Sequence, residues 1–344
     1  MTRSRDFRSD TVTQPTPEMR RAMMEAEVGD DILGEDPSVR ALESFSARLF
    51  AKEEALFVVS GTMGNQVAIQ ALTQRGDEIL VGEETHIFNL EVGGISALSG
   101  VQARPLRSHK GRFDPAEVVA AIRTGGIQSA ITRVLCLENT YDLNRGIPLP
   151  GEYIDEMAGI AHKHGMSVYL DGARVFNAAA ALGVSVGRIC GQVDALMFCL
   201  SKGLSAPVGS VLVGDSEFIG RARRVRQRLG GGMRQAGHMA AAGLVALKTM
   251  PGRLDEDHEN ALRLARGLSA IHPGLACPDE TGTNIVRVDF NCLGRDASFM
   301  VERLLVRGIK IKPVGSTACR MTTHRGITKG DVDEAISAIR DIVS

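Results

Sequence analysis

Short apolar segments alternate with helical segments between residues 55 and 215, and this alternation limits the folds that the chain can adopt. Each apolar segment has the length of a buried strand, and the segments between them carry apolar residues at helical spacing. Strands separated by helices favour a mostly parallel sheet with right-handed crossovers, so we predict an α/β fold. The predicted strands are residues 55–59, 78–81, 133–137, 167–170, 195–200 and 210–213.

The pattern changes after residue 252, which indicates a second domain. A chain of 344 residues is long for one compact core. We predict a large domain over residues 1–250, which includes an N-terminal arm over 1–20. A small α+β domain is predicted over residues 251–344.

The composition is that of an ordinary globular protein. A formal net charge of -1 and 44% hydrophobic residues argue against a nucleic-acid binder or a disordered tail. No stretch approaches 18 uninterrupted apolar residues and the first residues form no apolar leader, so we expect neither membrane insertion nor secretion. The six cysteines lack metal-ligand spacing, so we predict no metal site and expect a reducing cytoplasm.

Two chemically active side chains follow neighbouring predicted strands. Asp171 comes directly after residues 167–170, and Lys202 comes shortly after residues 195–200. Either residue alone has an ordinary explanation, since Asp favours helix N-caps and a loop lysine is usually solvated. Together they are the groups that a pyridoxal phosphate enzyme needs. The lysine forms a Schiff base with the cofactor aldehyde, and the carboxylate keeps the pyridine nitrogen protonated.

Two further strand ends carry residues that suit such a cofactor. The turn Ser60–Asn65 leads from a strand into a helix, where backbone N–H groups and the helix dipole favour a phosphate group. The turn has neither the Walker pattern nor the dinucleotide glycine spacing, and alone it is also compatible with a tight structural turn. His86 follows residues 78–81, where an imidazole could stack on an aromatic ring.

Several motifs in the same order resemble one known family over nearly the full length of the chain. This is the threonine aldolase/β-eliminating lyase family of fold-type-I pyridoxal phosphate enzymes. The resemblance implies a mostly parallel seven-stranded sheet in the large domain. The matching segments are Arg8–Thr13, Gly34–Pro37, Ser60–Asn65, His86–Ile87, Leu137–Thr140, Leu170–Arg174, Ser201–Leu204, Pro207–Val211 and Gly231–Gln235.

The resemblance implies a role for each cofactor-binding residue. Lys202 would be the Schiff-base lysine, Asp171 the partner of the pyridine nitrogen and His86 the residue stacked on the ring. The family is typically a homotetramer with active sites between subunits, which implies that Arg234 reaches the phosphate of a neighbour. The remaining cofactor contacts implied by the resemblance are Gly61, Thr62, Asn65 and Arg174.

The resemblance also implies a substrate and a reaction. Ser9, Arg174 and Arg320 would hold the carboxylate of an amino acid, a task that suits the planar guanidinium group. The implied reaction is retro-aldol cleavage of an L-β-hydroxy-α-amino acid to glycine and an aldehyde. Threonine, allo-threonine and phenylserine are the substrate types that we expect.

One position departs from the family pattern. Tyr141 stands where aldolases usually have a histidine close to the substrate hydroxyl, and the loop Asp142–Arg145 is longer than usual. Tyrosine has an ordinary pKa of about 10, so it would need strong activation to act as a base. Tyr141 remains a candidate for shaping the pocket or donating a hydrogen bond. Two alternatives follow: a sibling reaction, either β-elimination or racemisation, and a non-catalytic cofactor-binding protein within a complex.

Overall fold

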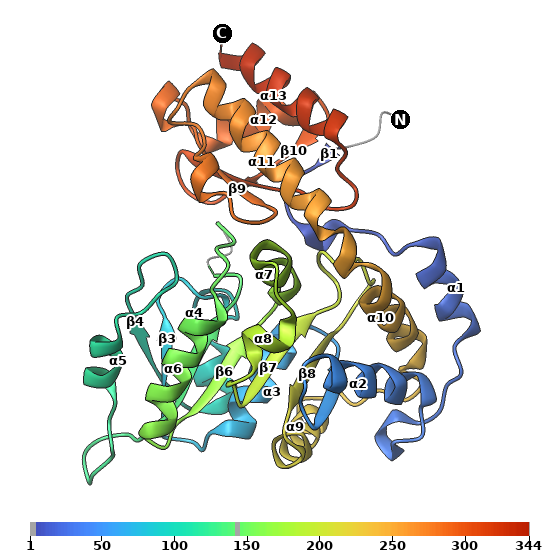
Figure 1. The fold of residues 1–344 in the computed structure, drawn as a ribbon, viewed down its shortest axis with the longest axis vertical. Helices are drawn as coiled ribbons and strands as arrows, with labels where there is room; N and C mark the ends of the chain where they lie inside the picture. The colour runs from blue at the N-terminus through green and yellow to red at the C-terminus, as the bar shows by residue number, and fades with distance from the viewer. Residues whose placement is uncertain (1–4, 142–144, 344) are drawn as a thin grey trace.

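The computed structural model describes residues 5–141 and 145–343, and its larger part is built on one seven-stranded sheet (Figure 1). The strand order is β2-β8-β7-β6-β5-β3-β4. The predicted α/β fold is therefore confirmed, and each strand predicted from the sequence is present. The strands are β2 (Glu54–Val58), β3 (Glu78–Gly82), β4 (Gln102–Leu106), β5 (Thr132–Glu138), β6 (Ser167–Asp171), β7 (Ala195–Cys199) and β8 (Ser210–Gly214).

The strand directions bring six carboxyl ends to one edge of the sheet. Strands β4, β3, β5, β6 and β7 pair in parallel. Strand β8 is antiparallel to both β7 and β2, so β2 runs in the same direction as β7. The segments that follow β2, β3, β4, β5, β6 and β7 therefore lie at the edge where ligands bind in such sheets.

Strand β4 was not predicted from the sequence. It lies at the end of the sheet and contains Arg104 and Pro105. Proline cannot donate a hydrogen bond to a neighbouring strand, so it is tolerated at a sheet edge but disfavoured inside. A half-exposed edge strand also needs no continuous apolar run, which explains why the pattern is weak there.

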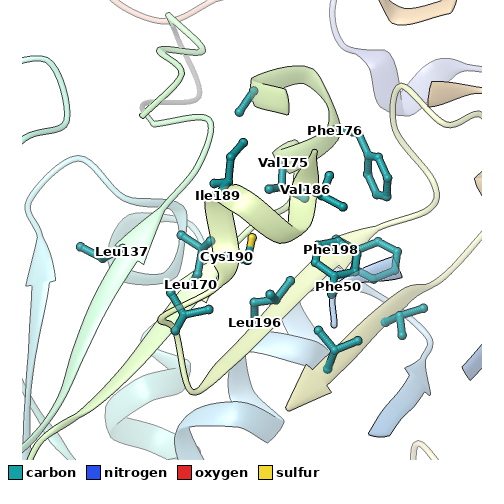
Figure 2. Close-up of a cluster of buried hydrophobic side chains, with 14 of the residues drawn as sticks. Phe50, Leu137, Leu170, Val175, Phe176, Val186, Ile189, Cys190, Leu196 and Phe198 are labelled. Carbon is teal, nitrogen blue, oxygen red and sulfur yellow. The ribbon is translucent and has the colours of Figure 1, made fainter. Parts of the chain in front are cut away.

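A buried hydrophobic cluster holds the site-bearing strands from one face (Figure 2). Leu137, Leu170 and Leu196 come from the neighbouring strands β5, β6 and β7. The Phe198 ring of β7 stacks on Phe50, with ring centroids 4.8 Å apart. Helices α7 (Val175–Leu182) and α8 (Val186–Cys190) close the cluster over these strands. Burial of each such side chain contributes roughly 1.5–3 kcal/mol to the free energy of folding, so the packed cluster holds the strand ends in fixed positions.

Several helices of the large domain begin at a capping side chain followed by proline. Thr16, Asp36 and Asp114 each accept a hydrogen bond from a backbone N–H of the first turn, and proline occupies the next position. The large-domain helices of eight or more residues, besides α7, are α1 (Pro17–Glu25), α2 (Pro37–Leu49), α3 (Gly61–Leu72), α6 (Gly151–Lys163), α9 (Ser216–Arg228) and α10 (Gly237–Thr249); α5 (Pro115–Ala121) and α4 (His86–Asn89) are shorter.

The C-terminal part forms a smaller α+β unit with its own core, reached through helix α11 (Leu254–Ile271) (Figure 1). Its three-stranded antiparallel sheet has the order β11-β12-β9. No helix among the described residues is long and apolar enough to cross a membrane. The remaining elements are β9 (Ile285–Asp289), α12 (Ala297–Val306), β10 (Ile309–Lys310), β11 (Lys312–Pro313), β12 (Ala318–Thr322) and α13 (Lys329–Val343).

The N-terminal arm contacts this smaller unit, which the sequence did not indicate. Strand β1 (Arg5–Asp6) pairs in parallel with β10, and Phe7 is buried in the core of the small unit. The arm then continues through Asp10 toward the large sheet, where Thr13 donates a hydrogen bond to the Lys202 backbone. Residues 9–13 are thus held between the two units, next to the carboxyl edge of the sheet.

Candidate active site

A cavity of about 140 Å³ lies at the carboxyl edge of the sheet and collects most of the predicted cofactor residues. A larger cavity of about 420 Å³ is lined by Ser108, Lys110 and Glu280, but by none of the predicted site residues. We take the smaller cavity as the candidate site because it combines a lysine, an aspartate and a helix N-terminus. The predicted residues that line it are Gly61, Thr62, Asn65, His86, Asp171, Arg174 and Lys202.

The N-terminus of helix α3 forms one wall of this cavity. Ser60 caps the helix by accepting from the Met63 N–H at 3.1 Å. The first N–H groups of a helix have no partner within the helix, so those of Gly61 and Thr62 suit an anion. Gly61 also permits close packing, because a Cβ there would lie 2.9 Å from the Cys199 sulfur. The wall therefore has the shape and polarity of a phosphate site.

Asp171 is buried at the end of β6 and is held by two donors. One carboxylate oxygen accepts from the Ala173 N–H at 3.0 Å, and the other accepts from Asn65 Nδ2 at 2.8 Å. The Asn65 side chain is itself fixed, because its Oδ1 accepts from the Tyr169 hydroxyl at 2.6 Å. Asp171 thus has a single orientation at the cavity wall.

His86 opens the short helix α4 after β3, and its position depends on two acids that the sequence did not single out. Its backbone N–H donates to Glu138 Oε2 at 2.7 Å, and its Nδ1 lies 2.9 Å from Glu91 Oε1. Glu91 is buried and has no motif around it, so nothing in the sequence pattern could have identified it. Glu138 lies in a matched motif, but no role was predicted for it.

One edge of the Arg174 guanidinium forms hydrogen bonds with a buried acid from the N-terminal arm. Its Nε and Nη2 donate to the two oxygens of Asp10 at 2.8 and 2.7 Å. Asn284 of the small unit also contacts Asp10, at 3.3 Å. Burial alone would raise the pKa of Asp10, but the Arg174 guanidinium, helped by the Lys202 charge, holds it well below its usual range. Asp10 is a site residue that sequence reasoning missed, although it follows Ser9 in a matched motif.

The other two predicted carboxylate ligands do not line the cavity. Ser9 caps a short helical turn by accepting from the Thr11 N–H. Arg320 is buried on β12, and its Nη2 donates to the Arg8 carbonyl at 3.0 Å. Burial lowers the pKa of Lys312, and the charges of Arg320 and Arg174 lower it further. The two arginines therefore contribute positive potential to the same region between the units.

Tyr141 does not line the cavity either. Its side chain is only 1% exposed, and its hydroxyl accepts from Ser108 Oγ at 3.0 Å. Burial raises the pKa of Tyr141 to about 12. The preceding Thr140 lines the cavity instead. Residues 142–144, which include most of the unusual loop, lie outside the described residues.

Arg234 also lies apart from the cavity of its own chain. Its side chain is 62% exposed, and its guanidinium pairs with Asp30 at 2.9 Å. The predicted contact with a neighbouring subunit therefore remains a prediction.

The residues that line the cavity fit pyridoxal phosphate. The amine of Lys202, the carboxylate of Asp171 and the helix α3 N-terminus face one space, and they match the aldehyde, pyridine nitrogen and phosphate of that cofactor. Thr140 Oγ1 is buried at this wall without a hydrogen-bond partner among the described residues, as expected for a group that meets a ligand. His86, Glu91 and Asp171 also lie close enough together for a metal ion. However, the Asn65 amide already donates to both carboxylates, which favours the organic cofactor.

Comparisons with known proteins agree with this assignment. Residues 6–291 match the family model described as β-eliminating lyase. The chain is 42% identical to low-specificity L-threonine aldolase 1 of Arabidopsis thaliana over 98% of this chain and 96% of that protein. It is 39% identical to the low specificity L-threonine aldolase of Escherichia coli strain K12 over 96% of each chain. The fold is similar to that of the Leishmania major threonine aldolase, with a TM-score of 0.84, 17% identity and coverage of 99% and 100% of the two chains.

Proposed function

The chain belongs to the β-eliminating lyase family, and from that premise we propose that it cleaves L-threonine and related L-β-hydroxy-α-amino acids to glycine and an aldehyde. It is a lyase that uses pyridoxal phosphate. The observation that carries the proposal is that Lys202, Asp171 and His86 line one cavity beside the N-terminus of α3.

Three parts of this chain would hold the cofactor. The Lys202 amine would bond covalently to its aldehyde carbon, and Asp171 would pair with its ring nitrogen. The N–H groups of Gly61 and Thr62 would bind its phosphate. Bound in this way, the cofactor supplies an electron sink for the pair of electrons released when the Cα–Cβ bond breaks.

The substrate carboxylate would bind to the free side of Arg174. Asp10 uses Nε and Nη2, which leaves Nη1 directed away from that pair. Arg320 and Lys312 add positive charge to the same region. We assign Asp10 to orient Arg174 and Arg174 to orient the substrate, with Arg320 as a second carboxylate contact and Ser9 beside it.

Cleavage requires a group that accepts the proton of the β-hydroxyl as the C–O bond becomes a carbonyl. Tyr141 is unsuited, because its hydroxyl is bonded to Ser108 and burial raises its pKa to about 12. His86 lines the cavity and offers an imidazole, so we assign it this role together with stacking on the cofactor ring. A proton returned to Cα then completes glycine.

A product assay with matched substrates tests this function. The purified protein with pyridoxal phosphate is given L-threonine, L-allo-threonine or L-phenylserine, and glycine and aldehyde are measured. We expect equal amounts of both products, and we expect Lys202→Ala to lower the rate by at least about 10³-fold. An α-keto acid with ammonia would indicate β-elimination, and an inverted amino acid would indicate racemisation. Bound cofactor without turnover would indicate the non-catalytic alternative.

We also propose that the chain assembles as a homotetramer in which Arg234 reaches a neighbouring cofactor. The support is the exposed side chain of Arg234 and the exposed apolar side chains of Phe88, Leu90 and Val92, which follow His86 in the chain. Light scattering on the purified protein tests the assembly, and a monomer with full activity would contradict it. A reducing cytoplasm is proposed from the six cysteines, all of which are free.

A further inference from the structure

The buried carboxylate of Glu91 has no part in the chemistry above, although it contacts three side chains behind the cavity. Oε1 accepts from Asn65 Nδ2 at 2.6 Å and lies 2.9 Å from His86 Nδ1, while Oε2 accepts from Gln66 Nε2 at 2.7 Å. Within the described part of the chain, no lysine or arginine forms an ion pair with it. A buried carboxylate without a fixed cation is costly, so stability alone is a poor reason for an acid here.

The contact with Glu91 determines which nitrogen of His86 carries the proton. An ionised carboxylate can only accept a hydrogen bond, so the 2.9 Å contact requires a hydrogen on Nδ1. The neutral imidazole then has its lone pair on Nε2. Nε2 has no hydrogen-bond partner among residues 5–141 and 145–343, and His86 lines the cavity. Glu91 therefore leaves Nε2 as the acceptor for a substrate proton.

The same carboxylate oxygen is also linked to Asp171 through the Asn65 amide. Asn65 Nδ2 carries two hydrogens, and it donates one to Glu91 at 2.6 Å and one to Asp171 at 2.8 Å. The Tyr169 hydroxyl donates a hydrogen bond to the amide oxygen of Asn65. A flip of this amide group by 180° would therefore break three hydrogen bonds. Glu91, Asn65 and Asp171 thus form one connected chain.

We propose that Glu91 is a positioning residue that sets two cofactor contacts at once. It holds His86 in the tautomer with Nδ1 protonated, and it fixes the Asn65 amide that orients Asp171. This inference rests on the proposed function, since it concerns the proton acceptor and the ring-nitrogen partner of that reaction.

The first experiment measures the tautomer directly. The holoenzyme is labelled with ¹⁵N in histidine, and the ring-nitrogen shifts of His86 are identified by their loss in His86→Asn. We expect a protonated Nδ1 and a bare Nε2 in the wild type without substrate. Glu91→Gln should give a mixture of tautomers. The control Glu83→Gln, an exposed acid before helix α4, should keep the wild-type pattern. A proton on Nε2 in the wild type overturns the proposal, and this result needs no variant that folds.

The second experiment separates positioning from general structural support. Removing the carboxylate partner of a functional histidine in metal sites lowers activity about 10- to 100-fold, and we expect a fall of this size in kcat for Glu91→Gln. KM should change much less, because the carboxylate clamp is untouched. Glu91→Asp keeps the charge and should recover part of kcat. An unchanged kcat in Glu91→Gln, or an equal fall in Glu83→Gln, overturns the proposal. If the wild type makes no glycine from any substrate, the proposed function fails while the tautomer measurement still tests Glu91.

Discussion

The ends of β5 and β6 lie side by side, yet they present their polar side chains in different ways. The two strands pair in parallel, with Glu138 opposite Asp171. After β6, both Asp171 and Arg174 line the cavity, and each is fixed by a buried partner. After β5, Glu138 and Thr140 line the cavity, but Tyr141 turns away from it.

The residues of the β5 end that leave the cavity are used to hold the neighbouring loops. Asn139 exchanges two hydrogen bonds with the Leu149 backbone, at 2.9 and 3.0 Å. Tyr141 packs closely against Gly82 and Gly111, because an added Cβ would lie 2.8 Å from its hydroxyl at Gly82 and 2.6 Å from its ring at Gly111. Neighbouring positions in one motif thus serve opposite purposes. The comparison teaches that a motif position identifies a site residue only when the backbone also directs that side chain into the site.

The largest effect in this comparison is expected from removing the partner of Arg174. Asp10→Ala leaves a buried guanidinium without its acid, which typically costs about 3–5 kcal/mol of unfolding free energy. It also releases Arg174 from the orientation that would bind the substrate carboxylate, so KM should rise. Urea unfolding and steady-state kinetics measure the two effects.

An exposed pair provides the matched control for Asp10→Ala. Asp333 and Arg263 are both about half exposed and form a similar two-point contact. Asp333→Ala should change neither stability nor KM appreciably, because exposed pairs contribute little. A wild-type KM in Asp10→Ala would mean that the orientation of Arg174 does not depend on Asp10. The buried partner of Arg174 would then no longer distinguish the end of β6 from the end of β5.

A smaller and pH-dependent effect is expected at the interface that supports the β6 end. His258 of α11 lies 3.2 Å from Asn177 of α7, with its Nε2 accepting from the amide. Burial lowers its pKa from 6.5 to about 4, despite the nearby charge of Asp255. The unfolded chain therefore binds a proton between pH 6.5 and 4 that the folded chain does not, so stability falls as the pH drops through this window. The shift corresponds to a loss on the order of 3 kcal/mol.

Replacing the titrating group isolates this contribution. His258→Gln keeps an acceptor for Asn177 but cannot titrate, so the slope of stability between pH 6.5 and 4 should flatten. Urea midpoints at several pH values measure the slope. The same slope in wild type and variant would assign the pH dependence to other groups.

The sequence predicted the cofactor-binding residues of the site better than the buried residues that hold them in place. Asp171 and Lys202 could be found because each lies at or shortly after the end of a buried apolar strand, and strand direction then brings them to one edge. Asp10 and Glu91 could not be assigned, because their partners Arg174 and Asn65 are distant in sequence. Those contacts exist only after the arm and the loops have packed. Edge strand β4 escaped detection for a related reason, since tertiary pairing rather than local pattern makes it a strand.

The smallest effect should come from the position where the chain departs most visibly from its family. Tyr141→Phe removes a hydroxyl that is bonded to Ser108 and keeps the ring that fills the space beside Gly82 and Gly111. Loss of one such hydrogen bond costs about 1 kcal/mol, so unfolding should shift slightly. Because the hydroxyl does not line the cavity, kcat should stay within about twofold of the wild type, and the ranking of the three substrates should not change. A twofold change in rate corresponds to much less than the roughly 1.4 kcal/mol of activation free energy that a tenfold change requires.

Tyr141→His completes this test, because it restores the residue that the family usually has there. The shorter imidazole would leave space against Gly82, which the hydroxyl end of Tyr141 contacts, so we expect lower stability and no gain in kcat from the substitution alone. A large gain would mean that the loop can redirect this side chain into the cavity. A large loss of kcat in Tyr141→Phe would place its hydroxyl in the reaction. In either case Tyr141 would belong to the catalytic site together with Glu138 and Thr140.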